Sequence, residues 1–123
     1  MDMETGRVVN GSDLELVVDI PTLNDTQYDA RGGNWELELW VYSSKRVKVR
    51  HTIERGFESI GEVDANAYVT DEGIELYIKA SKNPMGKGDM KAQMTIYADN
   101  PKFEDGIQVI KTIPDYEINI RIV

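Results

Sequence analysis

A strict alternation of apolar and polar side chains from Met90 to Ala98 is the feature that most constrains what this chain can fold into. Successive side chains of an extended strand point to opposite faces, so alternation over this length indicates a strand with one buried face. The buried face would carry Met90, Ala92, Met94, Ile96 and Ala98. The other face would carry Lys91, Gln93, Thr95 and Tyr97. The pattern therefore predicts a long, half-buried strand.

The same two-residue period recurs along the chain and predicts further strands. These strands are expected at residues 13–20, 35–42, 45–54, 65–70, 74–80, 107–112 and 116–122. Segments 35–42 and 45–54 are close enough to form a hairpin, as are 65–70 and 74–80. No segment shows helical spacing over three turns. The pattern predicts an all-β fold, an immunoglobulin-like antiparallel β-sandwich of seven to nine strands, with a barrel as the alternative.

The chain length is that of a single domain, since 123 residues match the usual domain size. We expect this domain to span residues 14–123. Residues 1–13 are mostly polar and include Gly6 and Gly11, which predicts a flexible N-terminal arm. The long polar loop at residues 22–34 is expected either to cross between sheets or to serve as a contact loop.

Charge and composition argue against several classes of partner. The formal net charge is −8, which opposes non-specific binding to nucleic acid and docking on anionic membranes. The chain has no cysteine, so disulfides and thiolate metal sites are excluded. The polar N-terminal residues predict neither a signal peptide nor a transmembrane helix, so work outside the cell would require another exit route, such as lysis.

Few residues suggest catalysis or metal binding. His51 is the only histidine and lies on the apolar face of its segment, which indicates a structural role in place of zinc binding or base catalysis. Acidic and amide side chains crowd the turn at residues 99–105, but their spacing does not match a calcium loop. The Gly86-Lys87-Gly88 sequence lacks the spacing of a phosphate loop. We therefore expect no enzyme activity, no catalytic residue, no metal site and no cofactor.

A basic segment is the one local reversal of charge in this acidic chain. It comprises Lys45, Arg46, Lys48 and Arg50. It is a candidate surface for receiving the acidic face of a neighbouring copy. Two structural alternatives remain open: cross-strand pairing with Glu36 and Glu38, and an edge strand protected from aggregation by its charges. Glu36 and Glu38 themselves fit a solvated face better than an acid–base pair.

Outward-facing aromatic side chains add a second candidate surface. Trp40, Tyr42 and Tyr97 are expected on polar faces, where aromatic residues can bind a sugar or anchor a partner protein. The candidate interface residues are therefore Lys45, Arg46, Lys48, Arg50, Trp40 and Tyr42. An extracellular carbohydrate-binding module is the alternative function that these aromatic residues suggest.

Two turns carry a resemblance to a known family. Residues 85–90 read Met-Gly-Lys-Gly-Asp-Met, where the family has leucine-glycine-x-glycine-x-leucine. Residues 100–106 read Asn-Pro-Lys-Phe-Glu-Asp-Gly and fit its proline-asp-x-phe-x-asp-gly turn. Residues 35–42 and 45–50 fit its aromatic-ended strand and lysine-rich strand. Over residues 14–123 the chain resembles small immunoglobulin-like virion structural proteins of phages and prophages from gut Bacteroides-type bacteria, and is similar to the N-terminal domain of the siphophage baseplate upper protein.

The resemblance implies a non-catalytic virion structural protein of the phage tail or baseplate. Its expected partners are other virion proteins and further copies of itself, and its expected location is the virion, after synthesis in the host cytoplasm and release by lysis. In the siphophage proteins this domain precedes a receptor-binding module, whereas the present sequence ends at Val123. That difference favours an adaptor or accessory subunit. The position of Phe103 in its polar turn predicts that it plugs the open end of the sandwich.

Overall fold

The protein folds as an all-β structure in a computed structural model that describes residues 6–42, 45–112 and 120–123. Twelve strands and no helix occur within these residues. Eight strands have four or more residues: β2 (Leu14–Val18), β5 (Asn34–Val41), β6 (Val47–Thr52), β7 (Gly56–Ser59), β8 (Ala65–Thr70), β9 (Gly73–Ile78), β10 (Gly88–Asp99) and β11 (Ile107–Thr112). The short strands are β1 (Gly6–Val8), β3 (Thr22–Leu23), β4 (Thr26–Gln27) and β12 (Ile120–Ile122).

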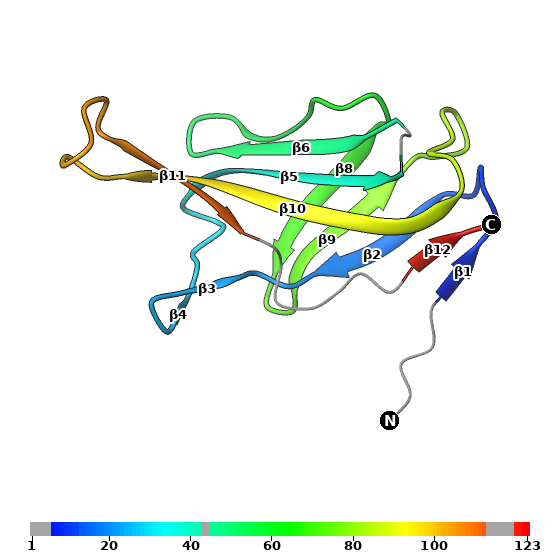
Figure 1. Ribbon diagram of the computed structural model, residues 1–123, viewed down its shortest axis with the longest axis horizontal. Coiled ribbons are helices and arrows are strands. Elements are labelled where there is room, and N and C mark those ends of the chain that lie inside the picture. The colour runs from blue at the N-terminus through cyan, green and yellow to red at the C-terminus, as the bar shows by residue number, and fades with distance from the viewer. Residues whose placement is uncertain (1–5, 43–44, 113–119) are drawn as a thin grey trace.

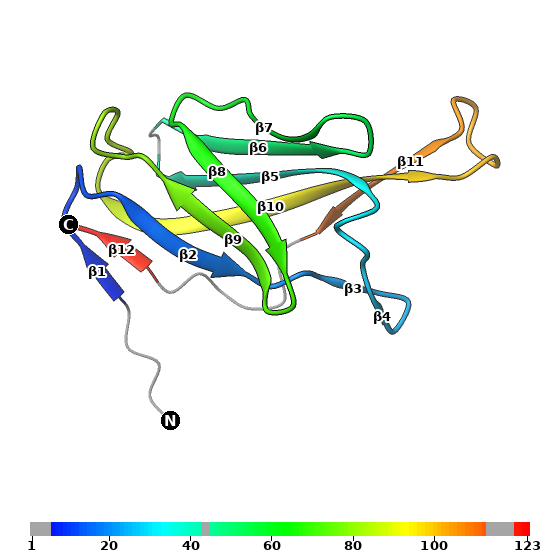
Figure 2. The same cartoon turned by 180° about the vertical axis from the view of Figure 1, so that it is seen from behind.

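Two sheets form the layers of a sandwich (Figures 1 and 2). The large sheet has the order β1-β12-β10-β5-β6-β7, and β11 pairs with β10 beside this path. The small sheet has the order β2-β9-β8, and β3 with β4 forms a separate hairpin. The all-β sandwich is thus confirmed over the barrel, as are the β5–β6 and β8–β9 hairpins. The immunoglobulin-like type stays a prediction.

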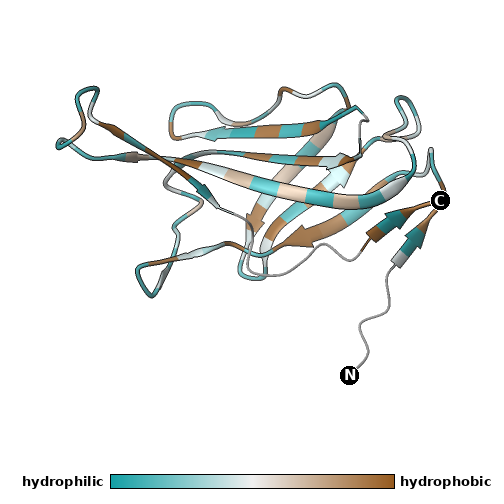
Figure 3. Cartoon of the chain, viewed as in Figure 1, coloured by the Kyte–Doolittle hydropathy of each residue, from teal (hydrophilic) through white to brown (hydrophobic). Residues whose placement is uncertain are grey.

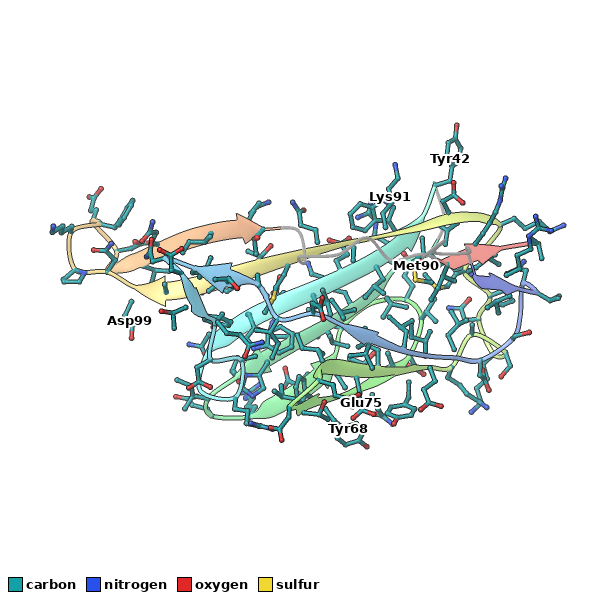
Figure 4. The ribbon with its side chains drawn as sticks, turned by 90° about the horizontal axis from the view of Figure 1, so that it is seen from below. Tyr42, Tyr68, Glu75, Met90, Lys91 and Asp99 are labelled. Carbon is teal, nitrogen blue, oxygen red and sulfur yellow. The ribbon has the colours of Figure 1, made fainter. Side chains whose placement is uncertain are left out.

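The core lies between the facing sides of the two sheets. Trp35, Leu37 and Leu39 of β5 are fully buried, and Ile74, Leu76 and Ile78 of β9 meet them from the small sheet with at most 1% exposure. Hydrophobic and hydrophilic bands alternate along β5 and β10 (Figure 3), as the two-residue period predicted. Figure 4 shows the layers edge-on, with Lys91 on the outer side of the large sheet and Tyr68 on that of the small sheet.

The long strand β10 joins the parts of the large sheet. Along one side it pairs with β5 from Met90↔Val41 to Tyr97↔Asn34. Along its other side it pairs first with β12 and then with β11, whose register ends at Asp99↔Ile107. β5 begins at Asn34, so beyond this residue β10 and β11 pair only with each other. Residues 98–108, called the projecting hairpin below, extend beyond the sandwich at the left of Figure 1.

The glycine turn before β10 has a sharply bent backbone. Gly86 and Gly88 have φ angles of 101° and 139°, which side chains disfavour. A Cβ at Gly88 would also lie 2.8 Å from Val41 Cγ1, so the close approach of β10 to β5 requires glycine there. Met85, at the start of the turn, is buried.

Two expectations need correction, and one open alternative is removed. Gly6–Val8 of the expected flexible arm forms β1, paired parallel with β12, while residues 1–5 lie outside the described residues. Phe103 is 47% exposed at the tip of the projecting hairpin, so it does not plug the sandwich. The basic segment is not at the sheet edge, because β7 pairs with β6 beyond it.

Of the predicted last strand, the described part is β12, and residues 116–119 lie outside the described residues. The described residues contain no helix long and apolar enough to span a membrane.

Candidate functional site

The outer face of the large sheet carries most of the candidate interface residues, arranged in rows across the strands. Thr95 of β10 lies opposite Glu36 of β5, which lies opposite Arg50 of β6. In the next row, Glu38 of β5 lies between Gln93 of β10 and Lys48 of β6. Because directly opposed side chains in a sheet share a face, each acidic residue of β5 is placed against a cation.

Three cations of the basic segment form ion pairs within the chain. Glu36 accepts from Lys48 Nζ at 3.4 Å and from Arg50 Nε at 3.2 Å, and its side chain is only 14% exposed. Glu38 pairs with Arg46. Lys45 lies beside these residues and donates to Asn83 Oδ1 at 2.5 Å. Cross-strand pairing, one of the alternatives raised by the sequence, therefore accounts for three of the four cations.

The aromatic candidates do not form one platform. Trp40 is half-buried, and the Arg46 guanidinium lies 4.9 Å from its ring centroid. Tyr42 is 86% exposed with a φ of 49°, and it projects from the end of β5 (Figure 4). Tyr97 lies at the opposite end of the β5–β10 pairing, opposite Asn34. Tyr97 is therefore separated along the sheet from Trp40 and Tyr42.

A groove of about 330 Å³ crosses this face beside Tyr97. Its lining is mostly polar and comprises Glu36, Glu38, Lys48, Gln93, Thr95, Tyr97, Val109 and Lys111. The Tyr97 hydroxyl donates to Glu36 Oε2 at 3.4 Å. Partial burial, and then the neighbouring Glu36 carboxylate, raise the pKa of Tyr97 above its ordinary value. The groove offers hydrogen-bonding groups and one aromatic edge to a polar ligand.

The projecting hairpin and β11 expose apolar side chains, of which the sequence singled out only Phe103, and that for a buried position. Phe103 is 47% exposed, Ile107 is 41% exposed and Val109 is 53% exposed. Ile110, on the opposite face of β11, packs partly against the core. Both faces of β11 therefore carry apolar residues, and the sequence pattern of this segment gave no signal for which face is buried.

The polar side chains at the tip of the projecting hairpin stabilise its turns. Asn100 Oδ1 accepts from the Lys102 amide at 3.1 Å, and Asp105 Oδ1 accepts from the Ile107 amide at 3.0 Å. Such Asx turns explain the acidic and amide residues of this segment. Within the part of the chain that the structure describes, no three acidic, histidine or cysteine side chains group as metal ligands would.

His51 has the structural role that its position on an apolar face predicted. It is 7% exposed, and its Nδ1 lies 2.6 Å from the Gly33 carbonyl oxygen. Its ring stacks on Trp35 with centroids 5.5 Å apart and contacts Phe57 at 4.8 Å. These contacts hold the loop before β5 against β6 and β7.

Comparisons with protein-family models, curated proteins and solved structures found no match to this chain.

Proposed function

We propose that this chain is a non-catalytic virion structural protein, an adaptor or accessory subunit of a phage tail or baseplate that works by burying protein–protein interfaces. The observation that supports an assembly role is the projecting hairpin, which carries exposed apolar side chains beyond the sandwich. Exposed apolar residues gathered on one projection are typical of surfaces that bind another protein. The phage context rests on the resemblance of the two turns.

The charges of the sandwich agree with this role. Arg46, Lys48 and Arg50 of the basic segment pair with Glu36 and Glu38, so these three cations do not require an acidic partner protein. The virion location and the immunoglobulin-like classification are parts of the same proposal.

Quantitative mass spectrometry of gradient-purified particles tests this proposal. Particles of the phage or prophage that encodes the chain should contain it in fixed proportion to the tail proteins. A variant in which Asn-Gly replaces residues 100–106 shortens the projecting hairpin, and it should fold but be depleted from particles. Phe103→Ser, which keeps the hairpin, provides a graded comparison. Absence of the unaltered chain from purified particles would rule the proposal out.

The groove beside Tyr97 favours one alternative, a carbohydrate-binding module. A polar groove with an aromatic side chain can hydrogen-bond hydroxyl groups and cover the apolar face of a sugar ring. Glycan-array binding that is lost in Tyr97→Ala and kept in Tyr68→Ala would support this alternative, since Tyr68 lies on the outer face of the small sheet. An array without signal would remove it.

A further inference from the structure

We propose that the free edge of β11 pairs with β11 of a second copy, antiparallel and centred on Val109, so that two large sheets join into one. This inference rests on the proposed assembly function and names the surface through which copies associate.

The outer edge of β11 is available for pairing. Among the described residues, β11 has β10 as its only strand partner. An unpaired row of backbone N–H and C=O groups is a template for another strand. Natural edge strands are commonly protected by proline, bulges or charged side chains, especially lysine. β11 reads Ile-Gln-Val-Ile-Lys-Thr and has a single charge, Lys111.

The alternation of hydrogen bonds identifies which residues of β11 face the free edge. The Asn100 amide donates to the Gly106 carbonyl at 2.8 Å, so Asn100 and Gly106 form a hydrogen-bonded pair of the β10–β11 ladder. Such pairs alternate along antiparallel strands, so Gln108, Ile110 and Thr112 direct their backbone groups toward β10. The backbone groups of Ile107, Val109 and Lys111 therefore point outward, and the Ile107 amide meets the Asp105 side chain there.

A two-fold axis through Val109 pairs the Val109 backbone groups of the two copies and each Lys111 amide with the Ile107 carbonyl of the other copy, while the Ile107 amide keeps its bond to Asp105. Val109 then lies opposite Val109 of the second copy, and Ile107 lies opposite Lys111. A two-fold axis perpendicular to the sheet keeps each side chain on its own face, so Ile107 and Val109 of both copies gather together. These two side chains are 41% and 53% exposed in the single chain, and the pairing covers them.

The charges favour a second copy as the occupant. In this register Lys111 lies diagonal to Asp105 of the second copy, within reach of a long side chain. The chain as a whole repels its copies with a net charge of −8. However, β11 continues into the projecting hairpin at the end of the sheet, and charges beyond a screening length of about 8 Å in physiological salt contribute little.

Cysteine cross-linking tests both the contact and its register. The chain has no cysteine, so Val109→Cys introduces a single thiol. Opposed Cα atoms of a hydrogen-bonded pair are about 5.5 Å apart, which a disulfide can span. We expect oxidised Val109→Cys to run as a covalent dimer. Ile107→Cys is the matched control, because its two thiols would be about four residues, or roughly 13 Å, apart.

Proline at the same position tests the backbone pairing. Val109→Pro removes only an outward N–H, so the ladder to β10 is retained. Sedimentation equilibrium should give twice the 13.9 kDa chain mass for the unaltered protein and for Val109→Thr. Val109→Pro should weaken the dimer at least tenfold while its circular dichroism spectrum stays that of the unaltered chain.

The outcomes separate this inference from the function on which it rests. A monomeric unaltered protein at millimolar concentration, or a dimer that Val109→Pro leaves intact, overturns the β11 pairing. Either result leaves the proposed function standing if purified particles contain the chain. Cross-linking of Ile107→Cys in place of Val109→Cys would also overturn the pairing about Val109.

Discussion

The paired charges above β5 and β6 and the free edge of β11 are two parts of one sheet with opposite properties. The first is rich in charge, yet Arg46, Lys48 and Arg50 all meet glutamates of the neighbouring strand. The second has few charges, and its Ile107 and Val109 face solvent. The residues that look most available for a partner in the sequence are thus used within the chain, whereas residues typical of a core are left outside.

Strand length and sheet face together cause this difference, since Ile107 and Phe103 lie beyond the start of β5 whereas Val109 lies on the outer face opposite Tyr97. β10 has 12 residues and β5 has eight, so the sheet narrows to a two-stranded hairpin where β5 begins. Over the sandwich, the outward side chains of β10 from Lys91 to Tyr97 lie opposite residues of β5. Beyond Asn34, only β10 and β11 remain in the large sheet, and the small sheet covers neither face of this two-stranded hairpin. Apolar residues there gain little burial in the single chain.

The largest effect on stability is expected when one apolar residue is replaced in the sandwich core and, for comparison, one on the projecting hairpin. Met94→Ala removes a fully buried side chain of β10 and should lower the free energy of unfolding by about 2–5 kcal/mol. Phe103→Ala, at the tip of the projecting hairpin, should change it by less than about 0.5 kcal/mol. Urea titration measures both. A large loss of stability in Phe103→Ala would show that the hairpin is packed in solution.

The second test removes charge pairing from the face above β5 and β6. Glu36→Gln leaves Lys48 and Arg50 without their shared carboxylate and should cost about 1 kcal/mol or less, since partly exposed ion pairs are weak. The cost should shrink in 1 M salt, where screening acts within about 3 Å. Glu104→Gln on the projecting hairpin is the control and should have no effect. If both variants were equally stable, the charges on the outer face of β5 and β6 would contribute no more to stability than those of the projecting hairpin, which would contradict the comparison.

The smallest effect is expected at an ion pair of the small-sheet side. The Lys79 side chain, and then the Ser81 amide, hold the pKa of Asp13 at about 2, below its ordinary 3.8. A lowered folded-state pKa means that the stabilisation is present above pH 4 and is lost as the pH falls through 2. Asp13→Asn should therefore be less stable than the unaltered chain at pH 7, and the two should converge near pH 2.

Thermal unfolding followed by circular dichroism at several pH values measures this convergence. Glu104→Gln should show no such dependence on pH. If the melting temperatures of Asp13→Asn and the unaltered chain still differ at pH 2, the stabilisation comes from packing and not from charge.

Much of the sandwich could be predicted from local pattern. The alternation in residues 35–42 and 90–98 predicted which side chains of β5 and β10 enter the core, and short spacing predicted the two hairpins. The single histidine on an apolar face predicted a structural role, which its contacts with Trp35 and Gly33 confirm. These features depend on residues close in sequence, and the local geometry of an extended chain decides which side chains share a face.

The candidate surface depended on features that no local pattern contains. Pairing of the basic segment with Glu36 and Glu38 was one alternative among three, and the register of β5 with β6 selected it. The parallel pairing of Gly6–Val8 with β12 joins opposite ends of the chain. The exposure of Ile107 and Phe103 follows from where β5 begins relative to β10, and Val109 is exposed because it lies opposite Tyr97 on the outer face of the large sheet.

The sequence by itself determined the longer strands other than β7, several turns and most of the core, because side-chain alternation and glycine or Asx turns act over a few residues. Only the tertiary structure decided which strand lies at an edge and how far each strand extends past its neighbour. Those properties arise from pairings between distant segments. The two regions compared above differ for this reason, although both belong to the sheet that the alternation of residues 90–98 predicted.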